Sequence, residues 1–143
     1  MAGRQIVLAV PADSSWELQQ AIYGALTGDP TLMALITGVH DHVPQGTAFP
    51  NITVGESTVR DSSAASVIGI ETTLILHVWS RERGRKEVKQ IMAELHRILH
   101  DADLTVAGHA LVDLRFQFGE TFLEPDGVTR HGFTRFRAIT DEA

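Results

Sequence analysis

The chain has 143 residues, 43% of them hydrophobic and 21% charged, which fits one domain that buries its own core. It contains no cysteine, so disulfides, zinc–thiolate sites, iron–sulfur clusters and a cysteine nucleophile are excluded. The net charge of −6 disfavours generic nucleic-acid binding through a basic surface, and no apolar run approaches the roughly 20 residues of a membrane span.

The N-terminal part predicts a short extension and then a helix. We expect residues 1–12 to form the extension and residues 13–140 to form the domain. Ser14 followed by Glu17 has the spacing of a capping box, in which the serine caps the helix and the glutamate bonds back to it. Gly28 is a typical helix end. The apolar stripe of this helix is formed by Leu18, Ile22, Ala25 and Leu26.

A second helix and two strands are predicted next. Asp29 is a good N-cap and Pro30 suits the first helical turn, so we expect a short helix that Gly38 ends. Residues 39–43 are compatible with a short strand. Residues 51–59 alternate between apolar and polar side chains, which indicates a second strand.

A polar loop and a long strand follow. Residues 60–66 are small and polar, which predicts a loop or an extended hairpin tip. Residues 68–80 predict a strand with apolar side chains on both faces, and this pattern favours a central position in the sheet. One face carries Ile70, Thr72, Leu74, Leu76 and Val78, and the other carries Glu71, Thr73, Ile75, His77 and Trp79.

The C-terminal half predicts a strong helix and a hairpin. Apolar residues recur at helical spacing from residue 84 to about residue 100. Residues 110–123 and 130–139 predict two strands, joined by a turn at 124–127. The element order is therefore α-α-β-β-β-α-β-β. We expect an α+β fold with a mostly antiparallel sheet of four or five strands and helices packed on one face.

Basic residues are concentrated around the turn before the long helix. Residues 81–97 hold six basic and three acidic side chains, a charge of +3 that leaves −9 on the rest of the chain. This uneven distribution is compatible with a solvated helix face, and equally with a bipolar surface that favours self-association. The basic residues are Arg81, Arg83, Arg85, Lys86, Lys89 and Arg97.

No catalytic motif stands out, and the sequence predicts no metal ligand, cofactor or catalytic residue. His96 and His100 have the spacing of a helical metal-ligand pair, and His40 lies near His42, but zinc needs three or four converging ligands. Solvated helix-surface histidines are therefore the favoured interpretation. Two acid pairs lie after the helix and near the last turn, where acids are commonly solvated: Asp101 with Asp103, and Glu120 with Glu124.

Trp79 lies at the end of the long strand, close to Arg81 and Arg83. One interpretation is a tryptophan at the rim of the core with arginines in solvent. The other is a contact patch, because tryptophan and arginine are enriched where interfaces concentrate their binding energy. The residues alone leave both open.

Three stretches, residues 49–56, 76–102 and 116–138, together resemble a family of small tail-completion proteins of long-tailed phages and gene transfer agents. The helical pattern at residues 18–23 and the Asp29-Pro30 break also look like this family. The similarity extends from about residue 16 to residue 138, and the order and spacing of these structural motifs carry it.

The resemblance implies an α/β sandwich and a non-enzymatic virion structural protein. Members of this family act as tail terminators: a ring of subunits, usually a hexamer, caps the tail tube and joins it to the head connector or stopper. We therefore expect a protein made in the bacterial host cytoplasm and placed at the head-proximal end of the virion tail, with DNA passing through the ring without specific binding. No cofactor or membrane partner is expected.

Ring closure requires two different patches on each subunit, and the basic segment against an acidic body could supply them. The alternatives are another head–tail joining component, or a small cytosolic enzyme or ligand-binding domain that uses its histidines. The candidate subunit or tube interface consists of Arg60, Asp61, Trp79, Arg81, Arg83, Arg85 and Arg130.

Overall fold

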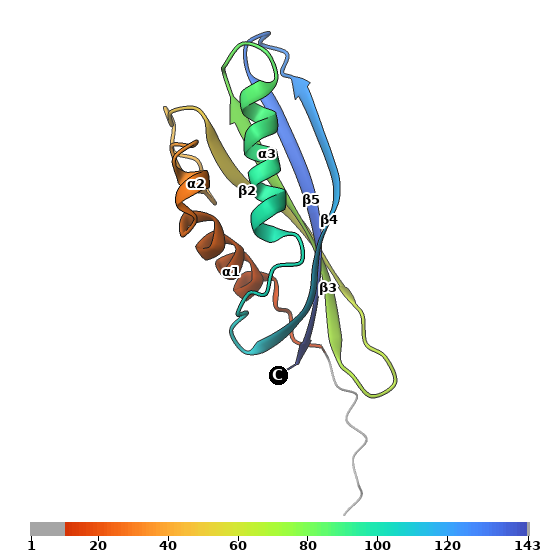
Figure 1. Cartoon of the computed structure of the whole chain (residues 1–143). Helices are drawn as coiled ribbons and strands as arrows, with labels where there is room; N and C mark the ends of the chain where they lie inside the picture. Colours follow the sequence, from red (N-terminus) through yellow and green to blue (C-terminus); the bar gives the residue numbers. More distant parts are fainter. Residues whose placement is uncertain (1–10, 143) are drawn as a thin grey trace, which may run out of the picture.

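The computed structural model describes residues 11–142, so the predicted extension over residues 1–12 lies outside the described residues except for its last two. Eight elements follow in the predicted order (Figure 1). The helices are α1 (Ser15–Thr27), α2 (Pro30–Met33) and α3 (Lys86–Leu99). The strands are β1 (Val39–His40), β2 (Asn51–Asp61), β3 (Gly69–Ser80), β4 (His109–Leu123) and β5 (Arg130–Glu142).

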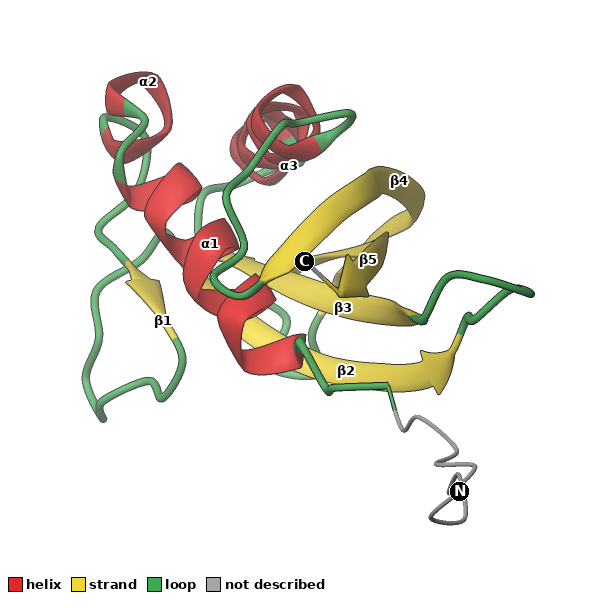
Figure 2. Cartoon of the chain, turned by 90° about the horizontal axis from the view of Figure 1, so that it is seen from below, coloured by secondary structure: helices red, strands yellow, loops and turns green. Residues whose placement is uncertain are grey.

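The strands form one five-stranded sheet in the order β1-β2-β3-β5-β4. All neighbouring pairs are antiparallel except β1 with β2. The three helices lie on one side of this sheet (Figure 2). The predicted α+β fold, with a mostly antiparallel sheet and helices on one face, is confirmed, and so is the central position of β3 between β2 and β5.

The core fills the space between the helices and the sheet. α3 buries the apolar stripe that its sequence predicts, and β3 buries alternate side chains against it. α1 contributes a smaller stripe of Leu18, Ile22 and Leu26. The long strands therefore have one face covered by helices. Within residues 11–142, no helix is long and apolar enough to cross a membrane.

The predicted capping box of α1 is wrong. The Ser14 hydroxyl makes no capping bond and lies instead 2.6 Å from Thr140 Oγ1 on β5. Asp13 Oδ1 accepts the hydrogen bond from the Ser15 amide at 2.8 Å. Ser14 is buried where the helix meets the sheet, so its hydroxyl is satisfied by the strand rather than by the helix end.

The second helix and the first strand are both shorter than predicted. α2 ends at Met33, and the chain then turns so that the Thr37 amide and hydroxyl bond to the carbonyl of Pro50, at 2.8 and 3.0 Å. These bonds draw the segment to the start of β2. β1 consists of Val39 and His40 alone and runs parallel to β2, because the loop over residues 41–50 returns the chain to the same end of the sheet.

The predicted loop at residues 60–66 begins two residues too early. Arg60 and Asp61 belong to β2, where they pair with Glu71 and Ile70 of β3. The turn itself occupies residues 62–68 and is closed by an isolated bridge between Ala64 and Val67. The polar composition of these residues could not distinguish a solvent-exposed hairpin end from a loop.

Candidate interaction surface

The sheet has one face that the helices leave uncovered, here called the open face. On β3, the half-buried side chains of Ile75, His77 and Trp79 point to this side, away from the core. The pairing register places side chains of β4 and β5 beside them. The open face carries His77, Trp79, Phe118, Phe122, His131 and Phe133.

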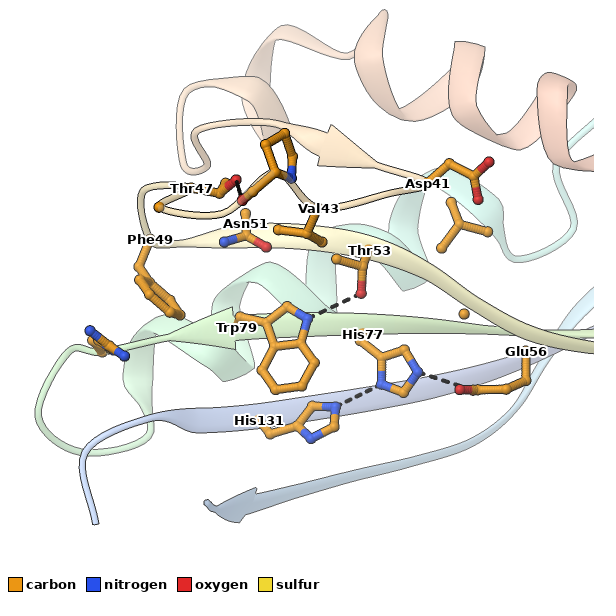
Figure 3. Close-up of a pocket in the computed structure, with 15 residues that line it drawn as sticks. Asp41, Val43, Thr47, Phe49, Asn51, Thr53, Glu56, His77, Trp79 and His131 are labelled. Carbon is orange, nitrogen blue, oxygen red and sulfur yellow. Dashed lines mark hydrogen bonds and ion pairs between the residues drawn. The ribbon is translucent and has the colours of Figure 1, made fainter. Parts of the chain in front are cut away.

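A groove of about 970 Å³ runs along this face at the end where β3 finishes (Figure 3). The loop after β1 forms one wall, with Asp41, Thr47 and Phe49 among its lining residues. Trp79 and His131 line the other side. Because its walls combine aromatic, acidic and basic groups, the groove suits a protein segment better than a small apolar ligand.

Trp79 is held in one orientation on this surface. Its ring stacks on His131, with the ring centres 3.9 Å apart and the planes inclined by 18°. Its indole Nε1 donates a hydrogen bond to Thr53 Oγ1 at 3.1 Å. Trp79 thus lies at the rim of the fold and presents a rigid aromatic surface to the groove, and its role as a contact stays a prediction.

A chain of four hydrogen-bonded side chains crosses the open face, and the sequence analysis missed it. Glu56 Oε2 lies 3.1 Å from His77 Nε2, and His77 Nδ1 lies 2.6 Å from His131 Nε2. His131 Nδ1 lies 2.7 Å from Glu124 Oε1. We name this Glu56–His77–His131–Glu124 arrangement the histidine chain.

Gly55 and a bulge in β2 make room for this chain. The pairing of β2 with β3 shifts between Val54 and Ser57, so Glu56 lies in the irregular segment. A Cβ at Gly55 would lie 2.5 Å from His77 Nε2, which is closer than packed atoms approach. A glycine at this position therefore leaves the space that the His77 ring occupies.

Burial and hydrogen bonding shift pKa values within the histidine chain in opposite directions. Burial lowers the pKa of His131, while its bond to Glu124 acts to raise it. The backbone amide of Glu56 itself, and then the hydrogen bond to His77, lower the pKa of Glu56. The ionised form of Glu56 is therefore favoured at the exposed end of the histidine chain.

Arg81 braces the groove rather than extending freely into solvent. Its guanidinium lies over the Phe49 ring, 4.3 Å from the ring centre, and its Nε donates to Thr129 Oγ1 at 3.2 Å. Asp126 accepts hydrogen bonds from the hydroxyl and amide of Thr129, and these bonds lower its pKa to about 2. The turn between β4 and β5 is thus tied to the end of β3.

The structure divides the predicted interface residues into two groups. Ser80 pairs with Arg130, so five of them gather at the end of the molecule where β3 finishes and α3 begins. These are Trp79, Arg81, Arg83, Arg85 and Arg130. Arg60 and Asp61 lie at the far end of β2, about 30 Å away for nine residues of strand.

Charged side chains lie at both ends of the same axis. The first end carries the basic turn before α3, and we call it the basic end (Figure 1, top). At the other end, β5 finishes with Asp141 and Glu142, which pair with Ala110 and His109, and Asp61 lies at the end of β2. Acidic side chains also lie at the basic end, among them Glu124 and Asp126 in the turn after β4, and Arg60 lies at the other end, so the bipolar surface stays a prediction.

Two further histidines, His96 and His100, contribute to packing. His96 is half-buried, and its ring centre lies 4.0 Å from that of Phe116. His100 Nδ1 accepts the hydrogen bond of the Phe116 amide at 3.1 Å. The solvated-surface interpretation is thus wrong for His96, which secures α3 against β4. Among residues 11–142, no group of three or more His, Asp or Glu side chains is placed to hold a metal ion.

α1 presents a second, different surface. Trp16 and Tyr23 are 57% and 46% exposed on its outer side. They line a hollow of about 580 Å³ together with His40 and His42. This hollow lies between α1 and the β1 edge of the sheet, and it shares Asp41 and Val54 with the groove.

Comparison with known structures agrees with this fold. A chain from the virion of a native gene transfer agent particle matches with a TM-score of 0.83 at 28% identity, over 90% of this chain and 97% of that one. The structure of the bacteriophage SPP1 gp17 protein matches with a TM-score of 0.63 at 23% identity, over 87% and 89% of the two chains, which supports the fold alone.

Sequence comparison identifies the family. Tail completion protein gp17 of Bacillus phage SPP1 is 24% identical over 124 residues, which cover 87% of this chain and 92% of that protein. The family model described as tail completion protein gp17 matches residues 20–141, most of the chain. The chain therefore belongs to the tail completion protein gp17 family, whose members are structural proteins of phage and gene transfer agent tails rather than enzymes.

Proposed function

We propose that this protein is a tail terminator. Its copies form a closed ring, a hexamer, that caps the head-proximal end of the tail tube and joins it to the head connector or stopper. DNA passes through the ring without specific binding, and the protein is made in the host cytoplasm before it joins the virion. The tail-completion role follows from family membership, and the ring and its position go beyond it.

The observation that carries this proposal is an uncovered sheet face with a rigid aromatic groove at a basic end. A head-to-tail ring needs two unlike patches on each subunit. The groove with its basic end is one of them, and the exposed face of α1 around Trp16 and Tyr23 is the other. Interfaces concentrate binding energy in aromatic and arginine side chains. The groove supplies Trp79 and Arg81, and the exposed face of α1 supplies two aromatic side chains.

The net charge supports the passage of DNA. A chain of charge −6 repels the phosphate backbone, so a ring of such subunits resists nonspecific binding while DNA moves through it. The hairpin end formed by Arg60, Asp61 and residues 62–68 extends from the sheet at the end opposite the basic end. We propose that it contacts a neighbouring subunit or the tail tube.

Reversing one charge at the basic end tests the proposal. We expect Arg83→Glu to weaken binding to purified tail tubes by about tenfold or more, because an introduced like charge opposes the partner surface. The loss should shrink at high salt, which screens exposed charges. Co-sedimentation of the protein with the tubes measures the binding.

The matched control is Arg115→Glu, the same reversal on β4 away from the groove, where Arg115 lies 3.8 Å from Asp101. Such an exposed pair contributes little to stability. Equal binding by both variants and the wild type would contradict the proposed interface. Binding to head connectors without binding to tubes would assign the protein to another joining component.

A further inference from the structure

The outer ends of the histidine chain fix where two protons lie. Glu56 and Glu124, as carboxylates, can only accept hydrogen bonds. His77 Nε2 lies 3.1 Å from Glu56 and His131 Nδ1 lies 2.7 Å from Glu124, so each of these ring nitrogens carries a hydrogen. In a neutral imidazole, the other nitrogen is then an unprotonated acceptor.

The two inner nitrogens face each other. His77 Nδ1 and His131 Nε2 are 2.6 Å apart, a hydrogen-bonding distance that requires a proton between them. Two neutral rings would present two lone pairs to each other, and two imidazolium rings would present two N–H groups. We propose that the histidine chain is a binding site for a single proton, which the two imidazoles share.

The surroundings keep water away from the inner bond. The side chains of His131 and His77 are only 11% and 16% exposed, so water cannot readily replace the inner bond. Trp79 stacks on His131, and the Phe122 ring centre lies 4.7 Å from that of His131 on the other side. A buried hydrogen bond without a proton would leave unsatisfied polar atoms, which is costly.

The charged groups facing the pair come from several elements. Glu56 of β2 and Glu124 after β4 contact it directly, and Glu120 of β4 pairs with Phe133 on the same face. Asp41 and Arg81 line the groove beside it. Arg135 lies farther along the same face, over the Phe118 ring. Carboxylates outnumber arginines among these groups, so the surrounding field favours one positive charge on the rings.

A pair that holds one proton is sensitive to pH in both directions. Loss of the shared proton at alkaline pH leaves two lone pairs opposed, and a second proton at acid pH places two cations in contact. Burial opposes a charge on His131 and lowers its pKa, the hydrogen bond with Glu124 acts to raise it, and a charge on His77 lowers it, so the closeness of the two rings opposes a second proton.

Nitrogen NMR of the imidazoles in the intact protein tests this inference. We expect hydrogens on His77 Nε2 and on His131 Nδ1 at neutral pH, with one further exchange-protected proton on the two inner nitrogens. The free energy of unfolding, measured in urea across pH, should fall on both sides of a maximum. Two neutral rings at neutral pH that titrate independently would overturn the proposal.

The variant His131→Gln supplies a second test. A glutamine amide can reach the position of Nε2 and donate to His77 Nδ1 without titrating, so the alkaline fall in stability should disappear. His42→Gln, a change at an exposed loop histidine, should leave the pH profile as in the wild type. An unchanged alkaline fall in His131→Gln would contradict the shared proton.

Discussion

Gly132 determines how closely α3 approaches the sheet. A Cβ at this position would lie 2.6 Å from Met92 Sδ and 2.8 Å from Val88 Cγ2, inside the distance at which atoms pack. We expect Gly132→Ala to lower the free energy of unfolding by about 1–3 kcal/mol, because overpacking forces α3 and β5 apart. Urea denaturation measures the change.

Gly24 is the matched control for this substitution. It lies inside α1, and nothing stands within 4 Å of the position that an added Cβ would take. Gly24→Ala should raise stability by up to about 1 kcal/mol, since alanine is the better helix former. If the two alanine variants proved equally stable, the close contact between α3 and β5 would not limit packing.

At the residue scale, the sequence indicates candidate side chains but not which distant side chains they contact. Trp79 and Arg81 could be proposed as a contact patch because Arg81 follows directly after the strand that Trp79 nearly ends. The bond between His77 and His131 joins residues 54 positions apart and depends on the register of β3 with β5. The sequence around each histidine predicts only the strand face on which it lies, so it does not predict the bond between them.

At the scale of elements, α3 is held against the sheet by a half-buried histidine. His96 packs on Phe116, and its Nε2 lies 3.3 Å from Thr134 Oγ1. Burial, and then the neighbouring His100, lower the pKa of His96 from its usual value of 6.5. The unfolded chain therefore binds more protons than the folded chain just below pH 6.5, and stability falls as the pH decreases through this range.

This linkage predicts the behaviour of one variant. His96→Gln keeps a polar side chain near Thr134 but cannot be protonated, so the fall in unfolding free energy on the acid side should become shallower. His42→Gln, at an exposed site, should keep the slope of the wild type. Stability curves in urea at several pH values compare the three proteins, and parallel curves for all three would argue against burial of His96.

Element types were predictable where the periodicity is long and uniform. α3 and the strands β3, β4 and β5 lie close to their predicted bounds because each has many apolar residues at one spacing. The errors occur where long-range contacts decide. α2 stops early because Thr37 bonds to Pro50, and β1 is short and parallel because the following loop returns the chain to the start of β2.

At the scale of the whole molecule, the basic turn before α3 and the acidic end of β5 lie at opposite ends of the sheet. The sequence indicated the basic turn as an excess of basic residues over residues 81–97, but the fold was needed to show that Arg60 and Asp61 lie far from them. The resemblance to tail-completion proteins rests on strand, turn and helix motifs spread over β2, β3, α3 and the hairpin of β4 and β5. Ring size is a property of the assembly, and no segment of one chain encodes it locally.

The direct test of the terminator role is negative-stain imaging of the purified protein mixed with tail tubes from its own particle. The proposed function predicts a ring of density at one end of each tube, with six subunits, and tubes that no longer elongate. The protein alone can be a monomer under this proposal if the ring forms on the tube. Tubes with bare ends, or protein bound along their sides, would contradict the terminator role.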